Sequence, residues 1–251
     1  MYRLFLFLLS VGFVSSIFSQ DANVLLKEGL NFERTLREDE ALAKYQHVLK
    51  VDKNNVQALI RSAELSCTIG ARQADKRSKL NHYSNAKDFA IAALLIDSNN
   101  ADANYVRALV AGKFTEIETD NKKIIENVKD IKAYADKALQ LNPKHARANY
   151  VLGKWNFEMV NLAWAKRAAV KLFYGGLPNA NIENAVAFME KARTLDQYFV
   201  INYLDLAKAY KYDDKPARAI EVLNKLVKLP TRTADDLGLK EEGKKMLSEM
   251  Q

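Results

Sequence analysis

Apolar side chains recur at helical spacing along most of the chain, and short joints interrupt the pattern. Each joint has an apolar residue, a polar pair or a proline, two further residues and then a new helical pattern. The four joints are VDKNNVQAL (51–59), IDSNNADAN (96–104), LNPKHARAN (141–149) and LDQYFVINY (195–203). This recurrence is typical of a helical repeat array. We therefore expect units to begin at residues 22, 56, 101, 146 and 200.

The stretches around these joints resemble the tetratricopeptide repeat, a pair of antiparallel helices in about 34 residues with small residues where the helices touch. The matching small residues in the first, fourth and last units are Gly29, Ala41, Gly153, Ala185, Ala207 and Ala219. Helices pack within roughly 8 to 10 Å only where side chains leave room, so Gly153 and Ala207 are expected to be structural. The resemblance implies an all-α, right-handed α-solenoid of about five helix pairs.

Three of the units are longer than the repeat they resemble. In the third unit, helical spacing continues from Asp120 to Leu139, which predicts longer helices. In the second unit, the polar bridge ARQADKRS (71–78) indicates additional loop. In the fourth unit, a stripe at i, i+4 spacing predicts an inserted helix over about 159–174, with core packing for its apolar residues. The stripe is formed by Val160, Trp164, Ala168 and Leu172.

The inserted helix is expected to stop at Gly175 and Gly176, and a turn through Pro178 should follow, with Asn181 capping the next helix. After the last pair, residues 229–250 should form a capping helix. Its apolar residues are expected to cover the exposed end of the core: Leu239, Met246 and Leu247.

The first twenty residues differ from the rest of the chain. They contain an early Arg3, an apolar run from Leu4 to Val14, and small and polar residues before Asp21. This layout predicts a secretory signal peptide over residues 1–20, with cleavage near Gln20 and a helical domain over 21–251. The protein is then exported, periplasmic or secreted, without a membrane span after cleavage. An uncleaved membrane anchor is the alternative, although the apolar segment is shorter than the roughly 20 residues that span a bilayer.

Charge and cysteine usage narrow the class of protein. The chain has 38 basic and 31 acidic residues and a formal charge of +7, but the two signs are interleaved. This pattern favours a solvated surface of mixed charge over a nucleic-acid footprint. The single cysteine, Cys67, cannot form an intramolecular disulfide and lies too far from the first segment to carry a lipid. We expect it to be a small buried group.

The chain carries no recognised catalytic motif. It contains no GxSxG, HExxH, GxxxxGK[ST], GxGxxG or CxxC pattern. Its three histidines, His47, His82 and His145, fall in different units, so neither a metal site nor a cofactor is predicted. His145 is expected to be a linker residue with no partner for catalysis. Trp155 and Trp164 are expected in the core, and an aromatic ligand cage is the alternative.

From Asn142 onward the order of features is more particular. The stretches GKWNFE, LAW, NYLDLAKAY and LPTRTADD occur in the order found in the regulator of microtubule dynamics family. The chain resembles that family's helical domain closely over about 110 of its 251 residues and loosely over the preceding hundred. The resemblance implies a repeat scaffold that binds other molecules. A membrane-anchored or cytoskeleton-associated member is one alternative, although the short first segment is similar to signals of bacterial envelope proteins.

Binding in such arrays usually uses the concave surface formed by the first helices. The Lys and Asn pair of the carboxylate-clamp members is absent from the corresponding positions. The last two units instead bring cations and aromatic rings to that surface: Arg147, Tyr150, Lys154, Lys208, Lys211 and Tyr212. These residues could hold a protein or peptide partner, including an acidic one, but they also suit an ordinary solvated groove. The leading hypothesis is a non-enzymatic scaffold of the cell envelope. The second is an envelope protein that captures a solute or glycan in a closed aromatic pocket.

Overall fold

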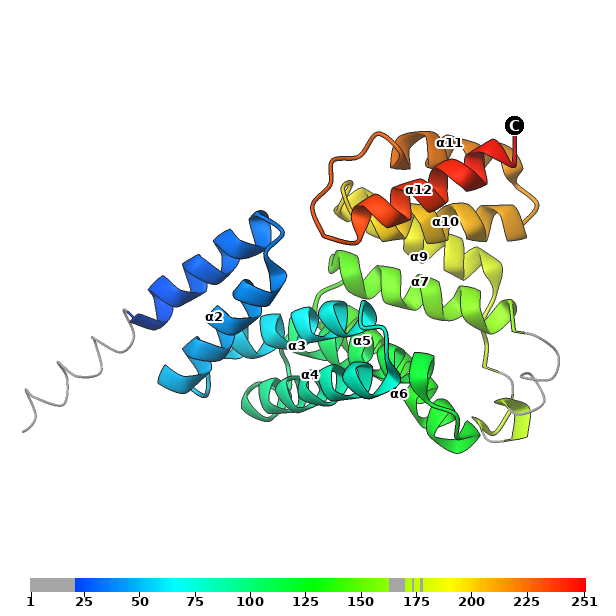
Figure 1. Ribbon diagram of the computed structural model, residues 1–251. Coiled ribbons are helices and arrows are strands. Elements are labelled where there is room, and N and C mark those ends of the chain that lie inside the picture. The colour runs from blue at the N-terminus through cyan, green and yellow to red at the C-terminus, as the bar shows by residue number, and fades with distance from the viewer. Residues whose placement is uncertain (1–20, 163–169, 173, 177) are drawn as a thin grey trace, which may run out of the picture. The chain divides into compact units, whose positions relative to one another are not determined.

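The computed structural model describes residues 21–162, 170–172, 174–176 and 178–251, and these are helical or loop residues without a β-strand (Figure 1). The chain divides into two compact units, Met1–Ser98 and Asn99–Gln251. Each is a series of helices.

In the first unit, the described residues form a helix over 21–34 followed by α2 (Glu38–Val51), α3 (Val56–Ala71) and α4 (Lys76–Ile96). α2 packs on α3, and α3 packs along α4. Buried residues along α3 include Cys67, which confirms the expected location of this cysteine.

Among its described residues, the second unit contains three helix pairs, a short helical stretch at 170–172 and a final helix. The pairs form between consecutive helices, and each pair also packs on the next one. The helices are α5 (Ala101–Ile117), α6 (Asn121–Leu141), α7 (Ala146–Val160), α9 (Ile182–Leu195), α10 (Val200–Tyr212), α11 (Pro216–Leu226) and α12 (Asp236–Ser248).

The expected joints between the repeat units are confirmed. The first helices of the second to fifth repeat units begin at Val56, Ala101, Ala146 and Val200. Three of these helices carry a side-chain cap one residue earlier, from Asn55, Asn100 and His145. Each cap accepts a hydrogen bond from the backbone N–H three residues on, which satisfies a donor that the helix itself leaves unpaired.

The extra residues of the second and third repeat units lengthen helices. In the third repeat unit, α5 has 17 residues and α6 has 21, and Asp120 caps α6 as expected. In the second repeat unit, the expectation of additional loop was wrong. α3 reaches Ala71 and α4 begins at Lys76, so only residues 72–75 connect them. Asp75 accepts a hydrogen bond from the Ser78 N–H at 2.9 Å, because polar residues suit a capped first turn as well as a loop.

The predicted inserted helix is only partly within the described residues. α7 ends at Val160, and residues 163–169, including Trp164, lie outside the described part of the chain. The prediction of core packing was wrong for Leu172, which is 74% exposed. Periodicity relates residues only within one continuous helix, and a turn at residue 161 separates Leu172 from α7.

The end of this insertion agrees with the sequence. Gly175 and Gly176 have φ angles of +90° and +133°, a region that favours glycine and ends a helix. Asn181 caps α9, because its side chain accepts a hydrogen bond from the Asn184 N–H at 2.7 Å.

The close helix contact predicted at Gly153 is present. A Cβ atom at this position would lie 2.6 Å from Cγ of Met189 and 3.0 Å from the Ala185 carbonyl oxygen, so α7 and α9 approach without room for a side chain. Trp155 is buried as expected, and its indole N–H donates to the Val128 carbonyl at 3.1 Å. Ala207 is also fully buried.

The predicted capping helix is α12, which packs on α10 and α11 (Figure 1). Leu239, Met246 and Leu247 all contact the buried core of these helices. Gly243 allows the approach, because a side chain there would collide with Leu226. α12 therefore lies along α10 and forms one wall of the site described next.

Candidate functional site

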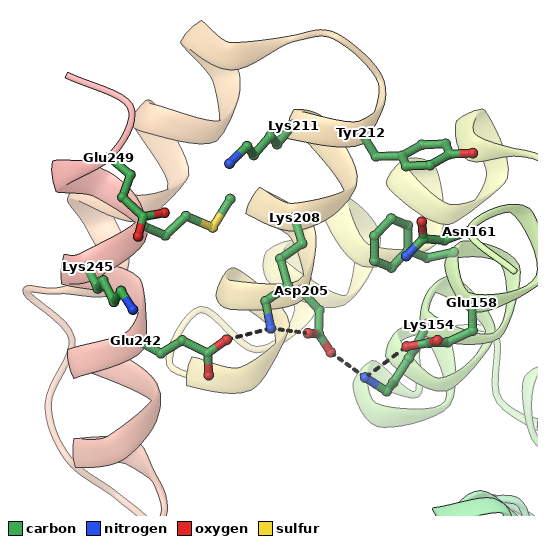
Figure 2. Close-up of a pocket in the computed structure, with 12 residues that line it drawn as sticks. Lys154, Glu158, Asn161, Asp205, Lys208, Lys211, Tyr212, Glu242, Lys245 and Glu249 are labelled. Carbon is green, nitrogen blue, oxygen red and sulfur yellow. Dashed lines mark hydrogen bonds and ion pairs between the residues drawn. The ribbon is translucent and has the colours of Figure 1, made fainter. Parts of the chain in front are cut away.

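A groove of about 620 Å³ lies between α7, α10 and α12 of the second unit (Figure 2). Its lining is rich in charged and aromatic residues and contains no cysteine or histidine. The lining residues are Lys154, Phe157, Glu158, Asn161, Asp205, Lys208, Lys211, Tyr212, Glu242, Lys245, Met246 and Glu249.

Helical spacing explains why these residues share one surface. The contributors from α7 and its C-cap start at Lys154 and follow at i+3, i+4 and i+7, and those from α12 and its C-cap start at Glu242 with the same spacing. Residues three, four and seven apart lie on one face of a helix. The α10 contributors, from Asp205 to Tyr212, fill the strip between the two walls.

Asp205 lies at the centre of the groove and is only 5% exposed. Its Oδ2 accepts hydrogen bonds from the Tyr150 hydroxyl at 2.8 Å and from Nζ of Lys154 at 2.9 Å. Both donors come from α7, so this carboxylate joins α10 to α7. A buried carboxylate needs such partners because burial removes its water.

The charges continue outward from Asp205 in alternating sign. Lys208 Nζ lies 3.7 Å from Asp205 Oδ1 and 2.8 Å from Glu242 Oε1 on α12. On the other side, Lys154 Nζ lies 3.7 Å from Glu158 Oε1. Figure 2 shows these ion pairs as one chain of contacts across the groove. The chain links all three helices.

The central contacts also shift two pKa values. Burial lowers the pKa of Lys154, but the Asp205 carboxylate, its hydrogen bond and Glu158 outweigh this effect, so the pKa is raised. Burial, followed by the charge of Asp205, raises the pKa of the Tyr150 hydroxyl well above 10. At neutral pH, Lys154 is therefore a cation and Tyr150 a neutral hydrogen-bond donor.

An aromatic pair forms the apolar part of the groove. Phe157 and Tyr212 meet edge to face, with ring centroids 5.8 Å apart and an interplanar angle of 85°. The Tyr212 hydroxyl donates to the Val160 carbonyl at 3.0 Å, yet the residue is 48% exposed. The hydrogen bond fixes the ring while half of the residue faces solvent.

The groove contains four of the six residues predicted from the sequence: Lys154, Lys208, Lys211 and Tyr212. Tyr150 lies beneath it, only 7% exposed, with its hydroxyl on Asp205. Arg147 lies outside the lining, and its guanidinium carbon is 5.1 Å from the centre of the Phe199 ring.

Sequence reasoning missed Asp205 and the wall formed by α12. One available signal for Asp205 was an acidic residue within the otherwise apolar run YLDLA. The signal for α12 was the shared spacing of Glu242, Lys245, Met246 and Glu249, which matches that of the α7 wall. Neither pattern says which helix the residues face.

His145 lies at the joint between α6 and α7, where the sequence placed it. Its Nδ1 accepts a hydrogen bond from the Ala148 N–H at 3.1 Å and caps α7, and its ring packs against Tyr105 at 4.9 Å. Nε2 lies 2.9 Å from an Asp102 carboxylate oxygen but lacks hydrogen-bond alignment. Tyr105 and Asp102 lie close to His145 because α5 and α7 are neighbours. His145 thus has a structural role at the start of α7.

The described residues contain no group of three or more His, Cys, Asp and Glu side chains placed to hold a metal ion. Within the same residues, no helix combines the length and apolar character needed to cross a membrane.

The model of the family described as "Regulator of microtubule dynamics protein 1-3" matches residues 21–251. The chain belongs to this family. Regulator of microtubule dynamics protein 1 of Caenorhabditis elegans is 28% identical over 94 residues, which cover 38% of this chain and 42% of that relative. The match therefore spans less than half the length of the curated relative.

Solved structures share the fold, and one of them is described as a thermophilic TPR protein. TTC0263 from Thermus thermophilus is similar with a TM-score of 0.63 and 15% identity, covering 90% of this chain and 99% of that one. PilF of Pseudomonas aeruginosa is similar with a TM-score of 0.53 and 16% identity, covering 93% and 90%. The predicted tetratricopeptide-repeat-like α-solenoid is confirmed.

Proposed function

We propose that this family member is a non-enzymatic helical scaffold that binds a protein partner through the groove between α7, α10 and α12. The observation that carries the proposal is the surface of the groove, where the exposed cations Lys211 and Lys245 share the lining with a half-exposed aromatic ring, Tyr212. Aromatic and cationic side chains are common anchors in protein interfaces. Helical repeat arrays often bind partners on the surface where their first helices line up.

The aromatic geometry favours a protein partner over a sugar or small solute. Capture of a solute or glycan was expected to need a closed aromatic pocket. Phe157 and Tyr212 instead meet edge to face, so their two ring faces cannot enclose a flat ligand. The buried Trp155 uses its indole N–H in the core, and the other tryptophan, Trp164, lies outside the described residues.

The ionisable centre of the groove favours a structural role over catalysis. Asp205 shares its charge with Lys154 and Lys208, and it holds the Tyr150 hydroxyl. A general base needs a free lone pair directed toward a substrate, whereas these contacts tie the carboxylate to its own helices. We therefore assign Asp205 a structural role, in which it holds the helices that form the groove.

Site-specific photocrosslinking tests the proposal. A photoreactive phenylalanine analogue replaces either Tyr212, in the groove, or Tyr198, which is 37% exposed and outside its lining. Both positions are exposed aromatic residues of the second unit, so they are matched in chemistry. After crosslinking in the native compartment, we expect Tyr212 to yield a defined protein adduct, identified by mass spectrometry, that Tyr198 does not yield. Equal adducts at both positions, or adducts only at Tyr198, would place binding elsewhere.

For location, we propose export directed by residues 1–20. Support comes from the composition of that segment and from the family match, which begins directly after it. A partner in a bacterial envelope then fits better than the cytoskeleton, and an anchored or cytoskeleton-associated protein is the competing proposal. Amino-terminal sequencing of the protein from cells should begin near Gln20. An intact Met1 would favour a retained anchor.

A further inference from the structure

The charges lining the groove are not all neutralised within it. The lining holds four lysines and four carboxylates, so its formal charges balance. Lys154 and Lys208 are engaged by Asp205, Glu158 and Glu242. Three charged groups remain that form no ion pair with any described residue, namely Lys211, Lys245 and Glu249. The unpaired part of the groove therefore carries an excess positive charge.

The two unpaired lysines come from facing helices. Figure 2 shows Lys211 extending from α10 toward α12 and Lys245 extending from α12 toward the groove. Both residues are exposed. Two cations that line the same groove from neighbouring helices attract an anion more strongly than either does alone.

An apolar surface lies in the same groove. Tyr212 is half exposed, and Met246, which packs partly against the core, also contributes to the lining. Methionine is flexible and adapts to side chains of different shape, while a fixed tyrosine ring offers a rigid contact. An apolar side chain of a partner could bury surface against both residues.

We propose that the groove binds a short acidic and apolar segment of a protein partner. One aliphatic or aromatic side chain of the segment contacts Tyr212 and Met246, and a neighbouring carboxylate lies between Lys211 and Lys245. Lys154 and Lys208 do not recognise the segment, because Asp205 and Glu242 already hold them. This inference rests on the proposed function, and it names the partner's chemistry and the two cations that select it.

Fluorescence anisotropy with labelled nonapeptides tests the selection. The first probe carries a central Phe with Asp two positions away on each side, so that all three side chains project from one side of an extended chain. The second has Lys in place of Asp, and the third has Ala in place of Phe. We expect the full-length protein to bind the first probe about tenfold more tightly than the second. The Ala probe should bind several-fold more weakly than the first, and added salt should weaken binding of the first probe.

Charge variants assign the effect to the two lysines. Lys211→Glu with Lys245→Glu should remove the preference for the acidic probe and shift it toward the Lys probe. A control with the same change in net charge uses two exposed lysines outside the groove, Lys191→Glu with Lys228→Glu, and should retain the preference. Glu249→Gln removes the unpaired groove carboxylate and should tighten binding of the acidic probe about two- to fivefold.

The outcomes separate this inference from the proposed function. Equal binding of the acidic and Lys probes, or a preference that survives in the Lys211 and Lys245 double variant, overturns the inference. A groove-specific crosslink from Tyr212 would still stand in that case, because it does not depend on charge. Absence of that crosslink would contradict both proposals.

Discussion

At the scale of single residues, Gly153 shows how a sequence pattern becomes a physical constraint. The resemblance to a repeat predicts a small residue, and the structure shows why glycine fits. A Cβ atom would collide with the Met189 side chain and press on the Ala185 carbonyl oxygen. Gly112, on α5, is a useful contrast, because the nearest atom to a Cβ there is Cδ1 of Ile131 at 4.0 Å.

The two glycines should respond oppositely to the same substitution. We expect Gly153→Ala to lower the free energy of unfolding by about 1 to 3 kcal/mol, since the helices must separate. Gly112→Ala should raise it by about 0.5 to 1 kcal/mol, since alanine favours the helix and space is available. Urea unfolding followed by circular dichroism measures both. A stable Gly153→Ala protein would contradict the helix contact.

Asp205 shows the opposite case, a residue whose role no repeat pattern reveals. Its carboxylate accepts hydrogen bonds from Tyr150 and Lys154 and joins α7 to α10. Asp205→Ala leaves both donors without this acceptor. Because Lys154 is partly exposed and can regain water, we expect a loss of about 2 kcal/mol, below the value for breaking a fully buried pair.

Asp205→Asn provides the control for volume. It retains a carbonyl acceptor for one donor and should therefore lose less stability than Asp205→Ala in the same urea titration. Equal losses for the two variants would mean that the space filled by this side chain matters more than its hydrogen bonds.

At the scale of an element, α7 depends on its first turn and on one face. His145 caps the helix through Nδ1, while Lys154, Phe157 and Glu158 line the groove. The cap fixes where the helix begins, and 3.6 residues per turn then fix which side chains reach the groove. A change at the joint therefore affects the site through the helix.

The cap can be separated from the ring of His145. His145→Ala removes both, whereas His145→Asn removes the ring and keeps an oxygen acceptor that suits this position. We expect the Asn variant to exceed the Ala variant in stability by about 1 kcal/mol. Hydrogen exchange at the Ala148 amide should be slower in the Asn variant. Identical stability and exchange would show that the ring, and not the cap, carries the role of His145.

At the scale of the whole molecule, buried tyrosines occur in both units and give stability a common pH dependence. Burial, with a smaller contribution from Glu64, raises the pKa of Tyr45 to about 12. Burial and a hydrogen bond to Glu190 raise the pKa of Tyr210 to about 12, and the pKa of Tyr150 is also raised. In the unfolded chain a tyrosine has a pKa of about 10.

The direction in which stability changes with pH follows from proton binding. Above about pH 10 the unfolded chain loses tyrosine protons that the folded protein retains, so raising the pH favours unfolding. Stability should be unaffected by these groups below about pH 10 and should fall as the pH rises toward about 12. Urea midpoints across this range measure the decline. Tyr45→Phe and Tyr210→Phe should each make it less steep, and an unchanged slope would contradict the raised pKa values.

The sequence by itself determined the helices, the joints between units and the small residues at helix contacts. These features are local: a cap such as Asn181 and a close-packed position such as Gly153 leave their signal within one or two turns. The same local rules were misleading for the bridge at 71–78, where polar residues served a helix start instead of a loop.

Only the tertiary structure decided the composition of the groove. α12 begins more than twenty residues after α10 ends, and no local pattern says that Glu242 meets Lys208 or that Asp205 is buried against Tyr150. Packing of α12 on α10 and α11 decided which lysines are neutralised and which remain unpaired. The sequence supplied Lys154, Lys208 and Lys211 as candidates but not Lys245, which lies on α12. Three-dimensional contacts separated Lys154 and Lys208, which are held in ion pairs, from Lys211 and Lys245, which form none with a described residue.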